Sequence, residues 1–450
     1  MNRAATEEIF RAAVARVDPV AMVEECVSLD GDMLVVTAGD RRRSVDLSAF
    51  REIWVVGAGK ASARMALGLE RVLGERIARG LVAVKYGHTE ELNRVELVEA
   101  GHPIPDEQSV AAAHAIAEIA DAADQETLVI ILVSGGGSAL LTSPYRDTRF
   151  TLSLDDIQTT TRLLLECGAP IQQINTVRKH LSAIAGGRLC ARLYPATVLT
   201  LILSDVVGDS LENIASGLTT PDPATFSNAL EIVERFAIAD RLPAVVRALL
   251  NAGVAGEVPD TPGPDDVSFA RVDNILVGTN ALAIEAARTA AERLGFNTVA
   301  LSSQITGEAA EVAKFYAGIA REVVRGPMLA GTPACILGGG ETTVTIRGDG
   351  LGGRNQELAL AFVREIEGDA EAFRGVTFLS GATDGNDGPT DAAGAFAAAE
   401  VVARAIAVGA SADDALARND SYTFFGATGD LLKTGPTNTN VCDIHVLLVE

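Results

Sequence analysis

The sequence is poor in cysteine and aromatic residues and has no long apolar run. Its five cysteines are scattered, without a CxxC pair or a histidine at ligand spacing, which argues against a zinc site and against a disulfide framework. No apolar segment approaches the roughly 18 residues of a membrane-spanning helix. The N-terminal segment has acidic residues where a signal peptide has an uninterrupted apolar core. We therefore expect a cytoplasmic protein without a membrane partner.

Lysine is also scarce, in a chain with an excess of acidic residues. There are 60 acidic and 37 basic residues, and the net charge of −23 argues against nucleic acid or an anionic membrane as a partner. Only five of the basic residues are lysines, so arginine serves the general surface role. A remaining lysine is therefore more informative, and Lys60, Lys179 and Lys433 lie in or beside glycine-rich motifs.

The stretch LVIILVSGGGSALL, residues 128–141, carries the clearest signal for a binding loop. Its first half is an apolar run without polar alternation, which predicts a strand of a parallel sheet covered on both faces. Three glycines flanked by Ser134 and Ser138 follow. Successive glycine amides and the start of a helix suit an anion, such as a phosphate or a carboxylate. The competing interpretation is a tight strand-to-helix turn that binds no ligand.

A second glycine turn, in IWVVGAGKAS, leads to Lys60 at the expected start of a helix. The turn resembles the dinucleotide fingerprint GxGxxG, but Ser62 replaces the third glycine. The next strand ends in Lys85, where such a site has an acidic residue. A P-loop is excluded because Trp54 stands where its first glycine belongs. Lys60 is expected to contact a phosphate or, failing that, to be a solvated lysine of the first turn.

Two further segments of the first half carry candidate site residues. INTVRKHLSAI predicts a helix with Asn175, Arg178, Lys179 and His180, which form either a solvated basic face or part of an anion pocket. The buried strand TVLTLILSD ends at Asp205. An aspartate at that position either holds Mg²⁺, as in phosphoryl-transfer folds, or caps the next helix.

The chain alternates strands and helices, which predicts an α/β fold of two α/β domains. The clearest linker is the proline- and glycine-rich segment NAGVAGEVPDTPGPDD. We expect a Rossmann-like domain over residues 1–255, with a mainly parallel sheet. A second α/β domain is expected over residues 268–450, its last strand being a candidate to return to the first. The active-site cleft is expected between the two domains.

In the second half, GGGETTV precedes a helix with Arg354 at its start, and TDGNDGPTD places Asp384 and Asp387 after a strand.

Glycine-rich strand ends, a few cations and strand-end aspartates together favour phosphoryl transfer. Amides and cations would hold phosphates, carboxylates would hold Mg²⁺, and one carboxylate would accept the proton of an attacking hydroxyl. No GxSxG elbow supports a hydrolase.

Many segments resemble one family. GAGKAS, GHPIPDE, LVSGGGSALL, NTVRKHLSAI, SDVVGD, GGGETTV, GGRNQELAL, TDGNDGPTDAAGA, NDSYTFF and TGPT resemble, in order, the glycerate 2-kinase family, which has a C-terminal MOFRL region and was historically labelled hydroxypyruvate reductase. The resemblance implies ATP- and Mg²⁺-dependent phosphorylation of D-glycerate at its 2-hydroxyl. The expected partners are these small molecules and, as a candidate, a second copy of the chain in a homodimer. The site residues assigned on this basis are Lys60, Arg354, Asp205 and Asp384 for catalysis; Ser134, Gly135, Gly136, Gly137, Ser138, Asn175, Lys179, Gly339 and Glu341 for ATP or glycerate; and Asp205, Asp384 and Asp387 for the metal.

Three positions depart from the family's pattern. Ala185 stands where a lysine is expected before GGRL, Leu218 where proline follows IASG, and Asn438 where glycine follows TGPT.

Two other functions compete with the kinase. An NAD(P)H-dependent hydroxypyruvate reductase is supported only by the GAGKAS turn, and a non-catalytic sugar-acid-binding protein would bind its ligand without ATP turnover.

Overall fold

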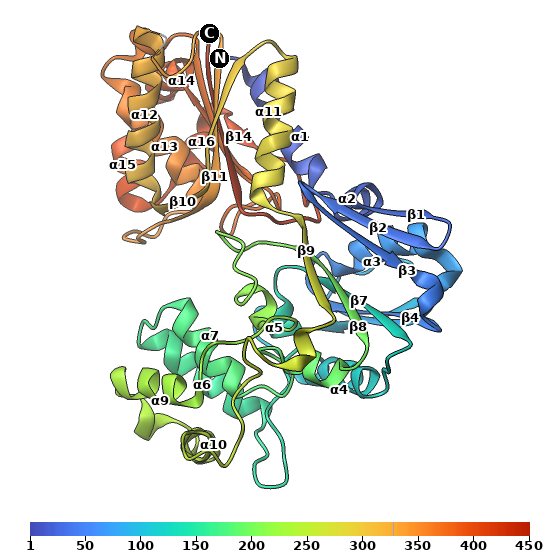
Figure 1. Cartoon of the computed structure of the whole chain (residues 1–450). Helices are drawn as coiled ribbons and strands as arrows, with labels where there is room; N and C mark the ends of the chain where they lie inside the picture. The colour runs from blue at the N-terminus through green and yellow to red at the C-terminus, as the bar shows by residue number, and fades with distance from the viewer. Residues whose placement is uncertain (327) are drawn as a thin grey trace. The chain divides into compact units, whose positions relative to one another are not determined.

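The computed structural model describes residues 1–326 and 328–450, which divide into two compact units (Figure 1). Unit 1 comprises Met1–Asp18 and Gly278–Glu450, and unit 2 comprises Pro19–Val277. The division differs from the predicted boundaries at 255 and 268. Helix α1 (Arg3–Arg16) belongs with the C-terminal half because it buries Phe10 against Gly381. Strand β9 (Val272–Gly278), expected to open the second domain, joins the sheet of unit 2.

Unit 2 contains the predicted, mainly parallel sheet. Its strand order is β6-β5-β4-β7-β8-β9, and the pairs from β6 to β8 are all parallel. The strands are β4 (Glu52–Ala58), β5 (Ile77–Lys85), β6 (Val95–Ala100), β7 (Thr127–Val133) and β8 (Thr197–Leu203). Every residue of β7 is buried, as its unbroken apolar run predicts. Helices α3 (Ser62–Leu73), α4 (Glu107–Asp121), α5 (Gly137–Leu140) and α8 (Arg188–Leu193) connect these strands.

Two smaller substructures complete unit 2. Helix α2 (Pro19–Cys26) leads to an antiparallel sheet of β1 (Val27–Asp30), β2 (Met33–Ala38) and β3 (Arg41–Asp46). A helical layer with its own apolar core contains α6 (Leu154–Glu166), α7 (Ile171–His180), α9 (Phe226–Arg235) and α10 (Ala244–Val254). Figure 1 shows these four helices gathered at the carboxyl side of β7 and β8. The helix at INTVRKHLSAI was predicted, and it forms α7, but the separate core of this layer was not.

Unit 1 has a mixed sheet with the order β10-β11-β15-β12-β13-β14. Its strands are β10 (Asn297–Glu308), β11 (Ala334–Thr343), β12 (Val376–Ala382), β13 (Gly394–Ala398), β14 (Leu431–Leu432) and β15 (Asp443–Val449). Only β10 and β11 pair in parallel. The expectation that the last strand returns to the first domain is wrong. β15 lies in the centre of this sheet, because its fully buried residues need a neighbour on both edges.

Helices cover both faces of the unit 1 sheet. Helix α1 packs on α11 (Asn280–Arg293) over one face. The other face carries α12 (Ala309–Arg325), α13 (Arg354–Glu367) and α14 (Ala399–Val408), with α15 (Ala412–Arg418) and α16 (Ser421–Thr428) beside them (Figure 1). Short 3₁₀ turns occur at Leu47–Ala49, Gly74–Arg76, Ile214–Ser216, Ala239–Arg241, Val267–Phe269 and Ala370–Phe373.

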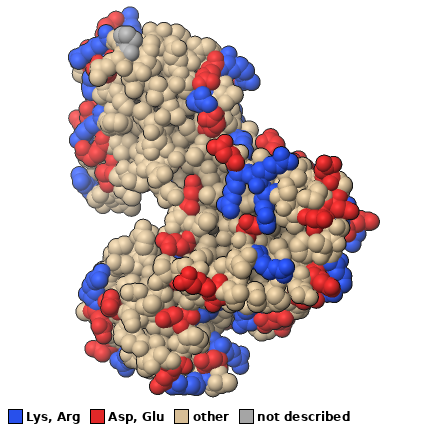
Figure 2. Space-filling view, in the orientation of Figure 1, with Lys and Arg blue, Asp and Glu red and all other residues tan. Residues whose placement is uncertain are grey.

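Acidic and basic side chains are interspersed on the surface, and the most visible basic patch lies beside β3 and β9 (Figure 2). Two arginines of β3 contact β9: Arg43 forms an ion pair with Asp273 at 2.7 Å, and Arg41 donates to the carbonyl of Asn274. These contacts join β3 to β9. Within residues 1–326 and 328–450, no helix is both long and apolar enough to cross a membrane.

Candidate active site

The loop Ser134–Ser138 lies between charged groups of both signs in unit 2. A Cβ atom placed on Gly135 would lie 1.8 Å from Oδ2 of Asp205. A Cβ on Gly136, whose φ is +90°, would lie 2.8 Å from the His102 ring and 3.4 Å from Cγ of Lys60. Only glycine allows these side chains to approach the loop backbone so closely. The loop thus has a carboxylate on one side and basic residues on the other.

Helix α5, which follows the loop, is shorter than the sequence suggests. It has four residues, Gly137–Leu140, so the positive end that we expected from a helix start is provided by the loop amides rather than by a long helix dipole. Ser138 hydrogen-bonds through its hydroxyl to Ser216 at 2.7 Å.

Ser134 has a structural role in this loop. Its buried hydroxyl accepts a hydrogen bond from the amide of Ala61 at 3.0 Å and contacts the hydroxyl of Ser62 at 3.0 Å. It thereby joins the carboxyl ends of β4 and β7. Ser62, which replaces the third glycine of a dinucleotide fingerprint, is part of this junction.

Lys60 is fixed to the glycine loop through its backbone. Its amide donates to the carbonyl of Gly135 at 2.9 Å, and its carbonyl lies 3.1 Å from Nδ1 of His88. The side chain is half-buried and passes Gly136. Burial, together with the charges of Lys60, Lys85 and His88, lowers the pKa of His102 to about 4. His102 is therefore a neutral imidazole at neutral pH.

The histidines His88 and His102 were not among the predicted site residues. The motif GHPIPDE was interpreted only as a rigid proline turn, although it carried a signal, since it recurs in the family that the sequence resembles. No local pattern places His102 beside Gly136, because the contact joins two loops that follow different strands.

Two carboxylates follow β8. Asp205 is half-buried beside Gly135, and Asp209 lies four residues later with φ of +53°. Burial raises the pKa of Asp209, against an opposing hydrogen bond from Ser204. Sequence reasoning selected Asp205 and missed Asp209. Among the described residues, no group of three or more His, Cys, Asp or Glu side chains could hold a metal ion by itself.

Helix α7 does not present all its basic residues to the loop. The ammonium of Lys179 lies 3.4 Å from Asp222, and both side chains are buried. Nδ1 of His180 donates a hydrogen bond to the carbonyl of Thr176 in the same helix. Lys179, expected to bind ATP or glycerate, is thus used in an internal ion pair with Asp222.

The other two candidates on α7 have different contacts. Asn175 is buried and reaches Asn213 at 3.5 Å. Arg178 reaches the glycine loop, with Nη2 at 3.5 Å from the carbonyl of Ser138.

Unit 1 contains a separate polar cluster centred on Arg354. Its guanidinium donates through Nε and Nη2 to the two oxygens of buried Asp443, at 2.6 and 2.9 Å, and through Nη1 to Glu341 at 2.8 Å. These carboxylates raise the pKa of Arg354. Arg354 lies at the start of α13, as predicted, and Glu341 lies beside it. Asp443 was missed, because the sequence VCDIHVLLVE reads only as a strand.

Asp387 does not fit the predicted metal site. Its Oδ1 accepts the amide and side chain of Asn355, and its Oδ2 accepts the amide and side chain of Gln356. The residue is 2% exposed, so its oxygens serve as a distant cap for α13. Burial raises its pKa to about 6. Asp384, at the end of β12, is half-buried and accepts the amide of Asn386 at 3.0 Å.

Gly339 is also placed differently from the prediction. It lies inside β11 and pairs with Ile444 of β15. A Cβ there would lie 2.2 Å from Oδ1 of Asn280. The glycine serves close packing under a helix start, and its role in binding ATP or glycerate stays a prediction.

Of the three departures from the family pattern, the structure explains one and places the other two together. Asn438 has φ of +61°, a conformation that asparagine adopts more readily than other residues with a Cβ. Ala185 and Leu218 are buried and line one small cavity together with Arg178.

The chain is similar to known proteins over nearly its full length. It matches the model of a domain of unknown function, DUF4147, over residues 5–251 and that of the MOFRL family over residues 334–443. A glycerate 2-kinase of Pyrococcus horikoshii is 39% identical over 97% of this chain and 95% of its own length. A protein of Agrobacterium vitis named putative hydroxypyruvate reductase is 39% identical over 99% and 94%.

A solved structure shares the fold. The crystal structure of a glycerate kinase from Thermotoga maritima has a TM-score of 0.86, with 36% identity over 99% of both chains. The similarity at this identity spans both units and both family models. The chain belongs to the glycerate kinase family, with a DUF4147 domain and a MOFRL region.

Proposed function

We propose that this protein is a kinase that transfers the γ-phosphoryl group of ATP to the 2-hydroxyl of D-glycerate, giving 2-phospho-D-glycerate and ADP. The observation that carries the proposal is the loop Ser134–Ser138, which has the Asp205 carboxylate against Gly135 and Lys60 against Gly136. Phosphoryl transfer needs cations and amides on the phosphate oxygens and a carboxylate nearby, and little else from the protein.

Lys60 is proposed to stabilise the transferring phosphoryl group. Its amide is bonded to Gly135 and its Cγ passes Gly136, which places the base of the side chain beside the loop. The hydroxyl oxygen forms a bond to the γ-phosphorus, the bond to the β-phosphate oxygen breaks, and ADP leaves with that electron pair. The hydroxyl proton passes to a carboxylate, for which Asp205 and Asp209 are the candidates in unit 2. The catalytic roles assigned to Arg354 and Asp384 in unit 1 stay predictions, as does the cleft.

The residues present fit an Mg²⁺ ion that is held partly by the protein and partly by the nucleotide. The ion is commonly held by one or two carboxylates, with phosphates and water completing its shell. Asp205, half-buried at the end of β8, fits that role, whereas the saturated oxygens of Asp387 do not. When bound, Mg²⁺ would neutralise charge on the phosphate oxygens.

The test of the proposal is ADP release that depends on D-glycerate and is abolished by EDTA. Enolase added alone should then form phosphoenolpyruvate, because it uses 2-phosphoglycerate directly. A signal that requires a phosphoglycerate mutase would place the phosphoryl group on the 3-hydroxyl and overturn this part of the proposal. NADH oxidation with hydroxypyruvate would instead favour the reductase. The junction of Ser62 with Ser134 and the basic end of β5 speak against a dinucleotide there.

A further inference from the structure

Three consecutive basic residues on α7, Arg178, Lys179 and His180, have different partners. Lys179 is neutralised by Asp222, and His180 bonds its own helix and has Asp260 at 3.7 Å. Arg178 has no carboxylate partner in the described part of the chain, and its one hydrogen bond is the long contact to Ser138. Burial lowers its pKa, and no acidic group opposes that effect.

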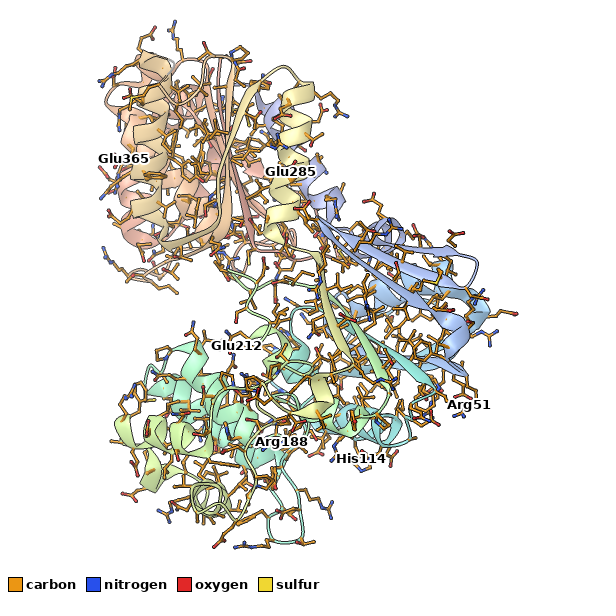
Figure 3. All side chains as sticks on the ribbon, in the orientation of Figure 1. Arg51, His114, Arg188, Glu212, Glu285 and Glu365 are labelled. Atoms are coloured by element: carbon orange, nitrogen blue, oxygen red, sulfur yellow. The ribbon has the colours of Figure 1, made fainter. Side chains whose placement is uncertain are left out.

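A neighbouring half-buried arginine shows what a well-partnered guanidinium looks like in this region. Arg188, labelled in Figure 3, donates to the carbonyls of Lys179 at 2.8 Å and Ser182 at 3.1 Å, and has Asp222 and Asp260 near it. Arg178 is half-buried as well but lacks such carboxylates, and a charge partly removed from water without a counter-ion is costly. Its guanidinium is therefore suited to bind an anion.

The surroundings of Arg178 favour a binding group. It lines a cavity of about 30 Å³ together with Ser138, Ser216, Ala185 and Leu218. The hydroxyls of Ser138 and Ser216 lie 2.7 Å apart and bond each other. Because a hydroxyl hydrogen rotates freely, each can exchange this bond for one to a ligand. Ala215 and Ser216 both have positive φ, of +48° and +56°, and such backbone strain is typical of ligand sites.

The strained turn is held rigidly in place. The carbonyls of Ser216 and Gly217 accept the amides of Gly186 and Gly187, at 3.0 and 2.8 Å. The cavity wall is thus fixed by backbone bonds rather than by the side chains that line the cavity.

We propose that Arg178, with the hydroxyls of Ser138 and Ser216, forms the subsite for the carboxylate of the acceptor acid. A planar guanidinium matches the two oxygens of a carboxylate, and the hydroxyls donate to the same oxygens. The small cavity suits a carboxylate head better than the larger triphosphate of a nucleotide. The identity of the acid rests on the proposed kinase function, but the carboxylate site itself does not. A phosphate of ATP is the other source of an oxyanion, and the experiment separates the two.

The first experiment compares Arg178→Gln and Arg178→Lys with wild type in steady-state kinetics. We expect Arg178→Gln to raise KM for D-glycerate by about 10- to 100-fold, with KM for ATP changed less than about threefold. Arg178→Lys keeps the charge and should lose less, because it lacks the bidentate fork. A rise in KM for ATP alone assigns Arg178 to the nucleotide and overturns the proposal.

The matched control is Arg162→Gln, because Arg162 lies on the surface of the same helical layer and forms an exposed ion pair with Glu166. It should leave both KM values unchanged. The charge can also be relocated: Arg178→Ala combined with Ala185→Lys places a cation on another wall of the cavity and should recover part of the D-glycerate affinity. No recovery, together with equal losses for Gln and Lys, would indicate a purely structural Arg178.

Calorimetric titration with D-glycerate, in the absence of ATP, makes the failure of this inference distinguishable from failure of the kinase assignment. If wild type binds D-glycerate without turning over ATP, the proposed function fails while the subsite stands, provided that Arg178→Gln weakens binding. If wild type is active and Arg178→Gln binds D-glycerate as tightly as wild type, the subsite fails alone.

Discussion

Each unit contains a glycine triplet after an apolar strand, and the two triplets have different structures. In unit 2, Gly135–Gly137 follow the end of β7 and contact charged side chains from other loops. In unit 1, Gly338–Gly340 lie inside β11, paired with β10 and β15. There the missing side chains make room for Tyr316 and Asn280. The same glycine triplet therefore forms a loop in one unit and allows close packing in the other, depending on the residues that surround it.

The aspartates of the two units differ in the same way. Asp205 and Asp387 both come after a strand, but Asp205 is half-buried beside a loop, whereas Asp387 is buried and accepts four donors at the start of α13. The position of an aspartate after a strand predicts its place at the edge of the sheet. The hydrogen bonds that its carboxylate already accepts decide whether it can contact a ligand.

The largest effect should come from Lys60→Ala. If the ammonium contacts the phosphoryl group mainly in the transition state, kcat should fall by about 100- to 1,000-fold, roughly 3–4 kcal/mol. The melting temperature should change little, because a half-buried lysine contributes little to a core. Steady-state kinetics and thermal unfolding measure the two effects, and wild-type turnover would assign Lys60 to a solvated surface.

Alanine at one glycine of each triplet tests the comparison directly. Gly135→Ala puts a methyl against Asp205 and should lower kcat by about tenfold or more, in addition to an overpacking cost of about 1–3 kcal/mol. Gly339→Ala, within β11, puts a methyl against Asn280 of α11 and should lower the unfolding free energy by a similar amount. The kcat of the folded protein should stay nearly unchanged. Denaturant unfolding and active-site titration separate these outcomes. An equal loss of kcat in both variants would show that the β11 triplet also serves catalysis.

Asp387→Asn tests the structural role of the cap. Because its folded pKa is raised from 3.8 to about 6, the folded protein binds a proton there more tightly than the unfolded chain. Its contribution to stability is fully present below pH 3.8 and is lost as pH rises through about 6, a change on the order of 2–3 kcal/mol. The difference in unfolding free energy between wild type and Asp387→Asn, measured from pH 4 to pH 7, should follow this trend. A flat difference would contradict the role of burial.

The smallest effect is expected for Lys433→Ala. Lys433 lies in unit 1 and forms an exposed ion pair with Asp391 at 2.9 Å. Exposed pairs of this kind contribute little to stability, so the unfolding free energy and kcat should both stay close to wild type. This lysine is the control for Lys60, and a large loss of activity would place Lys433 in the reaction and remove the contrast between the units.

The sequence alone determined the features that depend on local pattern. The unbroken apolar run predicted a doubly covered β7, glycine and lysine after β4 predicted a turn, and Arg354 was placed at the start of α13. The order of the motifs identified the family. These features are local because strand burial, turn conformation and helix starts depend on neighbouring residues.

Only the tertiary structure decided which side chains are available. Lys179 and Asp387 have the residue types of a binding site, but Asp222 and the α13 amides occupy them. Arg178, one residue from Lys179, is the group for which we propose a ligand. Helix α1 packs on the sheet of unit 1 and strand β15 lies within it, although no local pattern indicates their neighbours. Partners far apart in the chain meet only when the fold is complete, so no window of sequence encodes whether a charge is already compensated.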